Sequence, residues 1–130
     1  MSGKKSRQGE ALYADVRLEE HVLGAMMCYE EYAALIPRLT EEHFSVRPNV
    51  MVFGAIRELY RSGVRPSLYS VAEMLLSTGK LEPCGGMEYL TGLHETGSQA
   101  VRHESTVNSY YKQLCKYADR RYMAAALSEA

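Results

Sequence analysis

The sequence predicts an all-α fold: a compact bundle of about five or six short helices followed by one long C-terminal helix. Helical periodicity with start and stop residues recurs along the chain, whereas strand signals are nearly absent. The chain has 130 residues, enough for one domain with a core of its own, and 46% of them are hydrophobic. This composition is typical of a globular domain and not of a disordered chain.

The first helix is expected to begin after Asp15, whose carboxylate can accept a hydrogen bond from the first turn. Its apolar residues, among them Leu23, recur at helical spacing and share one face. A short helix follows and ends before Pro37, because a proline disfavours the α conformation of the preceding residue. One capped turn from Thr40 then brings Phe44 to the core.

A central helix is predicted from about Pro48 to Arg61, since a proline fits the first turn of a helix, where its missing N–H is not needed. Phe53 and Ile56 lie on its apolar face and are expected in the core. The sequence Ser62-Gly63 ends this helix.

The next helix starts at Ser67 or Ser70 after a proline, and Ser70 with Glu73 three residues on forms a capping box. Leu75 is assigned to the core face of this helix. Gly79 is expected to end it in the left-handed conformation, which glycine adopts without steric cost.

A paired-glycine turn, Gly85 and Gly86, leads into another amphipathic helix, which fades at Gly97. Tyr89 and Leu90 stand on the apolar face of this helix and complete the predicted core.

From about Ser105 an apolar stripe continues to Ala130 without glycine or proline, which predicts a single long helix. A helix of about 25 residues is roughly 37 Å long, more than a domain of this size needs to cover its core. We therefore expect it to project and to pair with a partner, and four of the ten tyrosines crowd the same helix. The residues assigned to this self-association or partner interface are Val107, Tyr110, Tyr111, Leu114, Tyr117, Ala118 and Tyr122.

The cysteines favour a reduced, cytosolic protein. Cys28, Cys84 and Cys115 are odd in number, widely spaced and outside any C-x-x-C pair, so neither a disulfide framework nor a zinc site is predicted. No apolar run approaches the ~20 residues that span a bilayer, and residues 1–9 lack the apolar segment of a signal peptide.

The sequence contains no recognisable catalytic signature. Ser77 to Lys80 superficially matches the end of a phosphate-binding P-loop, but Met74 replaces the first glycine and Leu81 the metal-binding hydroxyl, so a helix end explains it better. None of the four histidines is four residues from another, the spacing of two metal ligands on one helix face. No G-x-S-x-G sequence favours a Ser/His/Asp triad, although triads assemble across distance. We assign no catalytic, cofactor-binding or metal-binding residue.

Charge patterning predicts solvated helix faces. Adjacent acids such as Glu19 and Glu20 point about 100° apart on a helix, so a solvent-exposed face explains them better than an acid/base pair. Lys112, Lys116 and Arg120 form one cationic line on the last helix, which is usually another such face. A net charge of −1 gives no overall reason to expect nucleic-acid binding, so DNA contact should be weak or absent.

A set of landmarks, none specific by itself, resembles in order and spacing the N-terminal domain of DnaB-type replicative DNA helicases. The resemblance covers about residues 18–125. The matching residues are Glu20, Val22, Leu23, Gly24, Met26 and Met27 in the first helix, then Phe44, Phe53, Leu59, Pro66, Val71, Ala72, Leu75, Gly85, Gly86, Tyr89 and Leu90. The connector at residues 95–106 departs from the family, because it is longer and lacks the usual proline.

The resemblance implies a domain that does no chemistry itself. In the family such domains pair through a helical hairpin, form a collar on a hexameric ring and dock primase, and a helicase loader is a further partner. ATP and Mg belong to a separate C-terminal module that hydrolyses ATP, and the protein works in the bacterial cytoplasm or is encoded by a phage or plasmid. The implied division is a flexible polar arm at 1–14, a helical core at 15–97, and a connector with the first hairpin arm at 98–130.

One function of another class stays open: a stand-alone small helical protein of the same fold that binds nucleic acid or regulates a partner. A G-x-x-x-x-G-K-[ST] motif downstream of Ala130 would favour the helicase, and a stop codon the alternative.

Overall fold

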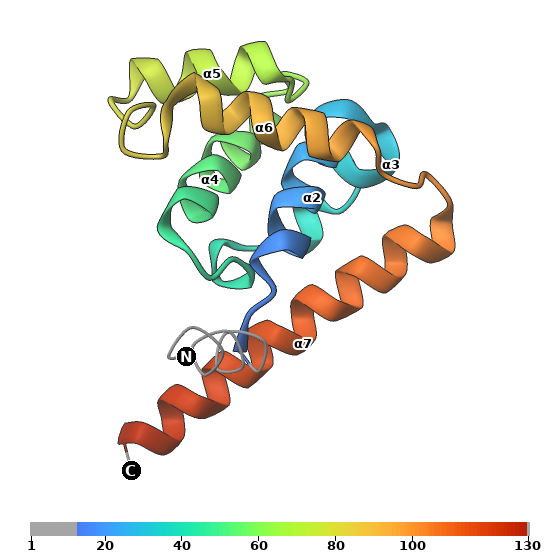
Figure 1. The fold of residues 1–130 in the computed structure, drawn as a ribbon, viewed down its shortest axis with the longest axis vertical. Helices are drawn as coiled ribbons and strands as arrows, with labels where there is room; N and C mark the ends of the chain where they lie inside the picture. Colours follow the sequence, from blue (N-terminus) through green and yellow to red (C-terminus); the bar gives the residue numbers. More distant parts are fainter. Residues whose placement is uncertain (1–12, 130) are drawn as a thin grey trace, which may run out of the picture.

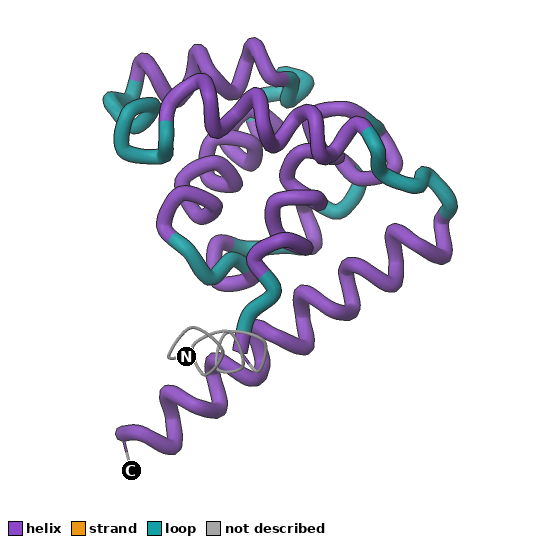
Figure 2. The backbone as a smooth tube through the Cα atoms, in the orientation of Figure 1, coloured by secondary structure: helices purple, strands orange, loops and turns teal. Residues whose placement is uncertain are grey.

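The computed structural model describes residues 13–129, and these contain helices and no strand (Figures 1 and 2). The all-helical class and the long C-terminal helix are confirmed. The proposed flexible arm lies, up to residue 12, outside the described residues. The elements are α2 (Val16–Cys28), α3 (Glu30–Ala33), the 3₁₀ turns η1 (Ile36–Arg38) and η2 (Glu41–His43), α4 (Arg47–Arg61), α5 (Leu68–Ser77), α6 (Gly86–Ser98) and α7 (Glu104–Glu129).

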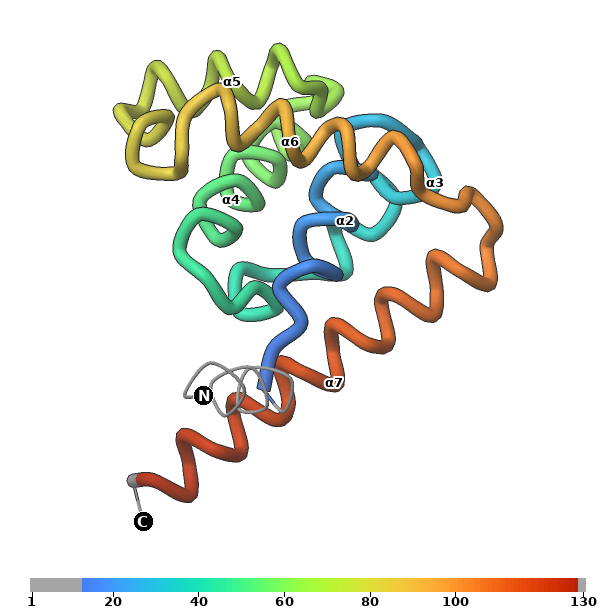
Figure 3. Tube along the Cα trace, in the orientation of Figure 1, coloured from blue at the N-terminus to red at the C-terminus, as the bar shows by residue number. Residues whose placement is uncertain are grey.

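Helices α2, α4, α5 and α6 form the body of the domain, and α7 runs along one side of it and past its end (Figures 1 and 3). Helix α2 packs against α6 on one side and against α7 on the other. The core lies between these layers, where the rings of Phe44 and Phe53 stack with centroids 4.8 Å apart. The buried residues include the predicted Leu23, Phe44, Phe53, Ile56, Leu75 and Leu90, while Tyr89 is half-buried against them.

Two glycines allow α2 and α6 to cross with their backbones almost in contact. A Cβ atom on Gly24 would lie 1.8 Å from the carbonyl oxygen of Leu93, and one on Gly97 would lie 2.0 Å from the carbonyl carbon of Gly24. Real Cβ atoms are not found at such separations, so no other residue fits at either position without moving a helix. The crossing fixes where α6 lies on the body.

A buried polar network joins α2, α4 and α6. The Glu19 carboxylate, 1% exposed, accepts hydrogen bonds from the Ser45 backbone N–H (2.9 Å), the Ser45 hydroxyl and the Asn49 amide (3.1 Å). Asn49 in turn accepts one from the Tyr89 hydroxyl. The expectation that the acids of this helix face solvent is therefore wrong for Glu19, because position 19 follows Leu18 onto the buried side of α2.

Helix α5 begins and ends through local hydrogen bonds. Its N-cap is Ser67, whose hydroxyl accepts from the Ser70 N–H at 3.1 Å while the Ser70 hydroxyl accepts from the Ser67 N–H. The predicted capping box of Ser70 with Glu73 is therefore wrong, and the alternative start at Ser67 is confirmed. At the other end Gly79 has a φ of 71°, and the Lys80 N–H donates to the carbonyl of Leu75 at 2.8 Å. This is a Schellman helix end, so the segment is not part of a P-loop.

The paired glycines before α6 both have positive φ, 116° at Gly85 and 73° at Gly86. A Cβ at Gly85 would also lie 2.8 Å from the Cβ of Tyr89. The turn therefore requires glycine by conformation at both positions and by space at the first.

The glycine crossing generates a stability prediction with an internal control. Gly24→Ala and Gly97→Ala should each lower the free energy of unfolding by about 3 kcal/mol or more, because the added methyl group meets backbone atoms. Gly92→Ala in the same helix meets nothing within 4 Å and should raise it by about 1 kcal/mol. Urea denaturation measures both, and equal effects at Gly92 and Gly97 would contradict the crossing.

The buried network generates a second prediction. Glu19→Ala leaves the Asn49 amide and the Ser45 N–H without their acceptor and should cost about 1–3 kcal/mol of stability. The matched control is Glu30→Ala, because Glu30 is exposed and should change the free energy of unfolding by at most about 0.5 kcal/mol. The same denaturation curves decide the outcome, and a Glu19 variant as stable as the control would contradict the network.

Candidate interaction surface on the C-terminal helix

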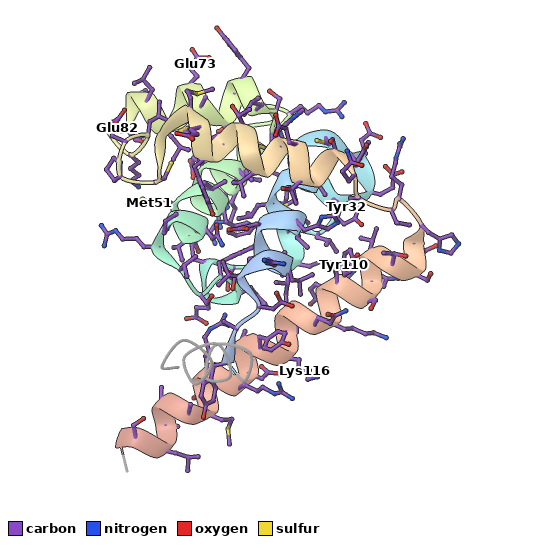
Figure 4. All side chains as sticks on the ribbon, viewed as in Figure 1. Tyr32, Met51, Glu73, Glu82, Tyr110 and Lys116 are labelled. Atoms are coloured by element: carbon purple, nitrogen blue, oxygen red, sulfur yellow. The ribbon has the colours of Figure 1, made fainter. Side chains whose placement is uncertain are left out.

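The first half of α7 packs on the body of the same chain. Val107 is 5% exposed and Leu114 1%, so the expectation that these two residues await a partner is wrong. The rings of Tyr110 and His21 form a T-shaped pair with centroids 5.5 Å apart, and the Arg38 guanidinium lies 4.0 Å from the centroid of the Tyr111 ring. Figure 4 shows Tyr110 between α7 and the body.

Two tyrosine hydroxyls anchor the connector through which α7 leaves α6. Tyr29 donates to the carbonyl of Ser98 at 2.7 Å and Tyr32 to that of Val101 at 2.6 Å. Arg102 pairs with Glu31 (2.9 Å). Burial raises the pKa of Tyr32 to about 12, so its hydroxyl keeps the donated proton at neutral pH. These contacts fix the connector that the sequence marks as a departure from the family.

Farther along α7 the contact with the body is polar. Arg121 donates to the backbone carbonyls of Tyr13 (2.8 Å) and Glu42 (2.9 Å). The Nε2 atom of His43 lies 3.7 Å from the Cys115 thiol, and its Nδ1 accepts from the Thr40 N–H at 3.0 Å. The C-terminal end of α7 extends past the body (Figure 1), and Tyr122 and Met123, which follow Arg121, are exposed.

The exposed part of the helix carries large apolar side chains. Tyr122 is 74% exposed, Met123 57% and Leu127 73%, and we call these three residues the α7 tail surface. Of the other predicted interface residues, Tyr110, Tyr111, Tyr117 and Ala118 are half-buried by the body. Met123 and Leu127 were not predicted at this surface, because the apolar stripe in the sequence runs through Tyr122 and nothing in it shows where the body ends.

The basic residues of α7 divide between its two sides. Lys112 and Lys116 are exposed, and Figure 4 shows Lys116 on the side of α7 that faces away from the body. Arg120 lies 5.6 Å from the ring centroid of Tyr117, while Arg121 is turned to the body. The predicted cationic line is therefore an outward face of α7.

The described part of the chain contains neither a cluster of metal ligands nor a membrane-spanning helix. Residues 13–128 contain no group of three or more His, Cys, Asp or Glu side chains that could hold a metal ion. Within the same range all three cysteines are free thiols, and burial raises the pKa of the Cys84 thiol. Helices long and apolar enough to span a membrane are also absent from the described residues.

The architecture is that of an all-helical domain that presents a long C-terminal helix. The sequence model of the family described as "DnaB-like helicase N terminal domain" matches residues 11–116, and the chain belongs to this family. The crystal structure of the N-terminal domain of DnaB helicase from Mycobacterium tuberculosis is similar, with a TM-score of 0.79 and 27% sequence identity. The match covers 91% of this chain and 82% of the mycobacterial chain. The resemblance found in the sequence is therefore confirmed.

The contact of α7 with η2 should weaken in acid. Burial is the largest effect and lowers the pKa of His43 below its usual 6.5. The backbone hydrogen bond with Thr40 opposes this shift, the nearby Arg121 lowers the pKa further, and Asp119 and Glu42 have smaller effects that raise it. The unfolded chain therefore binds the proton more readily, so stability is complete above about pH 6.5 and falls as the pH drops through the lowered pKa. We expect the melting temperature to fall between pH 7.5 and pH 5.5.

His43→Gln should remove part of this pH dependence, and burial of His21, whose pKa is also lowered, accounts for another part. The matched control is His103→Gln, since His103 is exposed on the connector. Equal pH slopes for His43→Gln and the unmodified chain would show that His43 does not titrate in this window.

Proposed function

We propose that this chain is the non-catalytic N-terminal domain of a replicative DNA helicase, and that it serves ring assembly and the docking of replication partners. The observation that carries the proposal is the α7 tail surface, which leaves Tyr122, Met123 and Leu127 in water on a helix that extends beyond its own body. Family membership supports the helicase context. Hydrolysis of ATP with Mg belongs, in this proposal, to a separate module of the parent protein.

The energetics favour self-association of the tail. Burial of one large apolar side chain is worth about 1.5–3 kcal/mol. In a two-fold symmetric dimer the same residue is buried on both copies, so each residue of the surface contributes two times. The last turns of α7 carry Ala124, Ala125 and Ala126, small residues that let a second helix approach closely. A homodimer through this helix is therefore the contact that the surface supports best.

Replication partners complete the proposal. Primase is the expected partner of the domain, with a helicase loader as a second, and the basis for both is the family alone. For DNA we propose weak contact or none, because the net charge is −1 and the exposed cationic line on the described part of α7 is short, comprising Lys112, Lys116 and Arg120. Tight binding of single-stranded DNA at physiological salt would instead favour a stand-alone nucleic-acid-binding protein.

The test of self-association is a dilution series followed by sedimentation equilibrium. The variant combines Tyr122→Glu with Leu127→Glu, both at exposed positions, so the fold should be kept. Leu114 is unsuitable because it is buried in the body. We expect the dimer dissociation constant to rise about tenfold or more, since two buried charges replace two apolar contacts.

The matched control is Ser77→Glu, an exposed position on α5 that should leave association unchanged. A chain that stays monomeric at high concentration, or a tail variant that dimerises as tightly as the unmodified chain, would overturn self-association through the tail.

A further inference from the structure

The thiol of Cys115 lies in a cluster of polar side chains where α7 meets the 3₁₀ turns η1 and η2. Its sulfur is 3.7 Å from Nε2 of His43 in η2, and Tyr111, one turn earlier on α7, forms a hydrogen bond with it. The guanidinium of Arg38 in η1 lies 4.0 Å from the centroid of the Tyr111 ring. A nucleophilic side chain, an imidazole and a phenol from separate parts of the chain therefore meet at one point, and the proposed function makes no use of them.

The hydrogen bonds of His43 determine which of its nitrogens carries the proton. Burial lowers the pKa of His43, so the ring is neutral at neutral pH and only one nitrogen is protonated. Because Nδ1 accepts a hydrogen bond from the Thr40 N–H at 3.0 Å, the proton is assigned to Nε2. Nε2 is therefore an N–H donor directed at the sulfur of Cys115.

Tyr111 supplies the sulfur with a second donor. Its hydrogen bond with Cys115 raises the pKa of Tyr111, so the hydroxyl keeps the proton that it donates. Hydrogen-bond donors at a sulfur stabilise the thiolate, which is the nucleophilic form of cysteine. The surroundings of Cys115 are therefore those of a reactive thiol.

The other two thiols have the opposite surroundings. The sulfur of Cys28 lies 3.7 Å from the carbonyl oxygen of His94, and that of Cys84 lies 3.1 Å from the carbonyl oxygen of Leu81. A carbonyl oxygen accepts the thiol proton and so favours the protonated form, and burial raises the pKa of both thiols. Cys84 is also fully buried, whereas Cys115 is half-buried and within reach of solvent.

We propose that Cys115 is a modification site that reacts with small soluble disulfides. The thiol loses its proton to solvent, the thiolate sulfur forms a bond to one sulfur of the disulfide, and the bond between the two disulfide sulfurs breaks. The leaving sulfur departs with the electron pair as a second thiolate, so the products are a mixed disulfide on Cys115 and one small thiol.

The space beside the cluster suits a mixed disulfide. A cavity of about 460 Å³, lined by His43, Asp119 and Arg121, offers room for the attached group. A group on the sulfur also takes the place of the contact between Cys115 and His43, which is one of the contacts that join α7 to η2. Modification at this site therefore loosens α7 on the body.

Reaction with dithiobis(nitrobenzoate), an aromatic disulfide whose released thiolate is coloured, tests the site on the full chain. We expect one of the three thiols to react about tenfold or more faster than the others, and Cys115→Ser to remove this fast phase. Cys28→Ser is the matched control, because Cys28 is also half-buried, and should leave the fast phase in place. Incubation with oxidised glutathione, followed by mass spectrometry of peptides, should place the mixed disulfide on Cys115.

Two further variants test the donors themselves. Tyr111→Phe removes the hydroxyl and keeps the ring, and His43→Ala removes the N–H donor. Each should slow the fast phase about threefold or more, because the thiolate loses a hydrogen bond. Tyr110→Phe is the matched control, since the Tyr110 ring packs against His21 instead.

The reaction of the buried Cys84 separates a lost donor from a loosened fold. A variant that merely loosened the chain would speed up the reaction at Cys84 and at Cys115, whereas a lost donor slows Cys115 alone. The proposal is overturned if Cys115→Ser keeps the fast phase, if the three thiols react alike, or if removal of both donors leaves the rate at Cys115 unchanged.

Discussion

The close crossing of α2 and α6 is the constraint on which the rest of the domain depends. Gly24 and Gly97 bring the two backbones so near that a single added methyl group would meet main-chain atoms. Because backbone atoms cannot rotate away as side chains do, this crossing allows only one relative position of the two helices. The hydrophobic core on either side then packs against a fixed frame.

The position of α6 determines the path of α7. Helix α6 ends one residue after the crossing, at Ser98, and the Tyr29 and Tyr32 hydroxyls hold the carbonyls that follow. These contacts start α7 beside α2, where Val107 and Leu114 fill the body, and direct its tail beyond the end of the body. The surface available for self-association is thus a consequence of the crossing at the other end of the connector.

The buried Glu19 network adds directional hydrogen bonds to an otherwise apolar core. An ionised carboxylate is costly to bury unless hydrogen bonds satisfy it, and here Ser45 and Asn49 supply three donors from the segment that starts α4. Since those donors are fixed by the backbone and by Tyr89, the network holds α2, α4 and α6 in one register. Apolar packing alone would tolerate small shifts between these helices.

The sequence by itself determined the helices, their ends and most of the core. Asp15, Ser67 and Gly79 are local signals, because an N-cap or a left-handed glycine acts within one turn of the chain, and periodic residues such as Phe53 and Leu75 must share a face. The order of these signals was also enough to indicate the family.

Only the tertiary structure decided which polar and apolar residues are covered. Glu19 resembles a solvated acid in the sequence because its donors lie 26 and 30 residues away, and Leu114 resembles an interface residue because nothing local shows that the body reaches it. The exposure of Leu127 depends likewise on where another segment ends. Burial is set by contacts between distant parts of the chain, which helical periodicity in one segment cannot reveal.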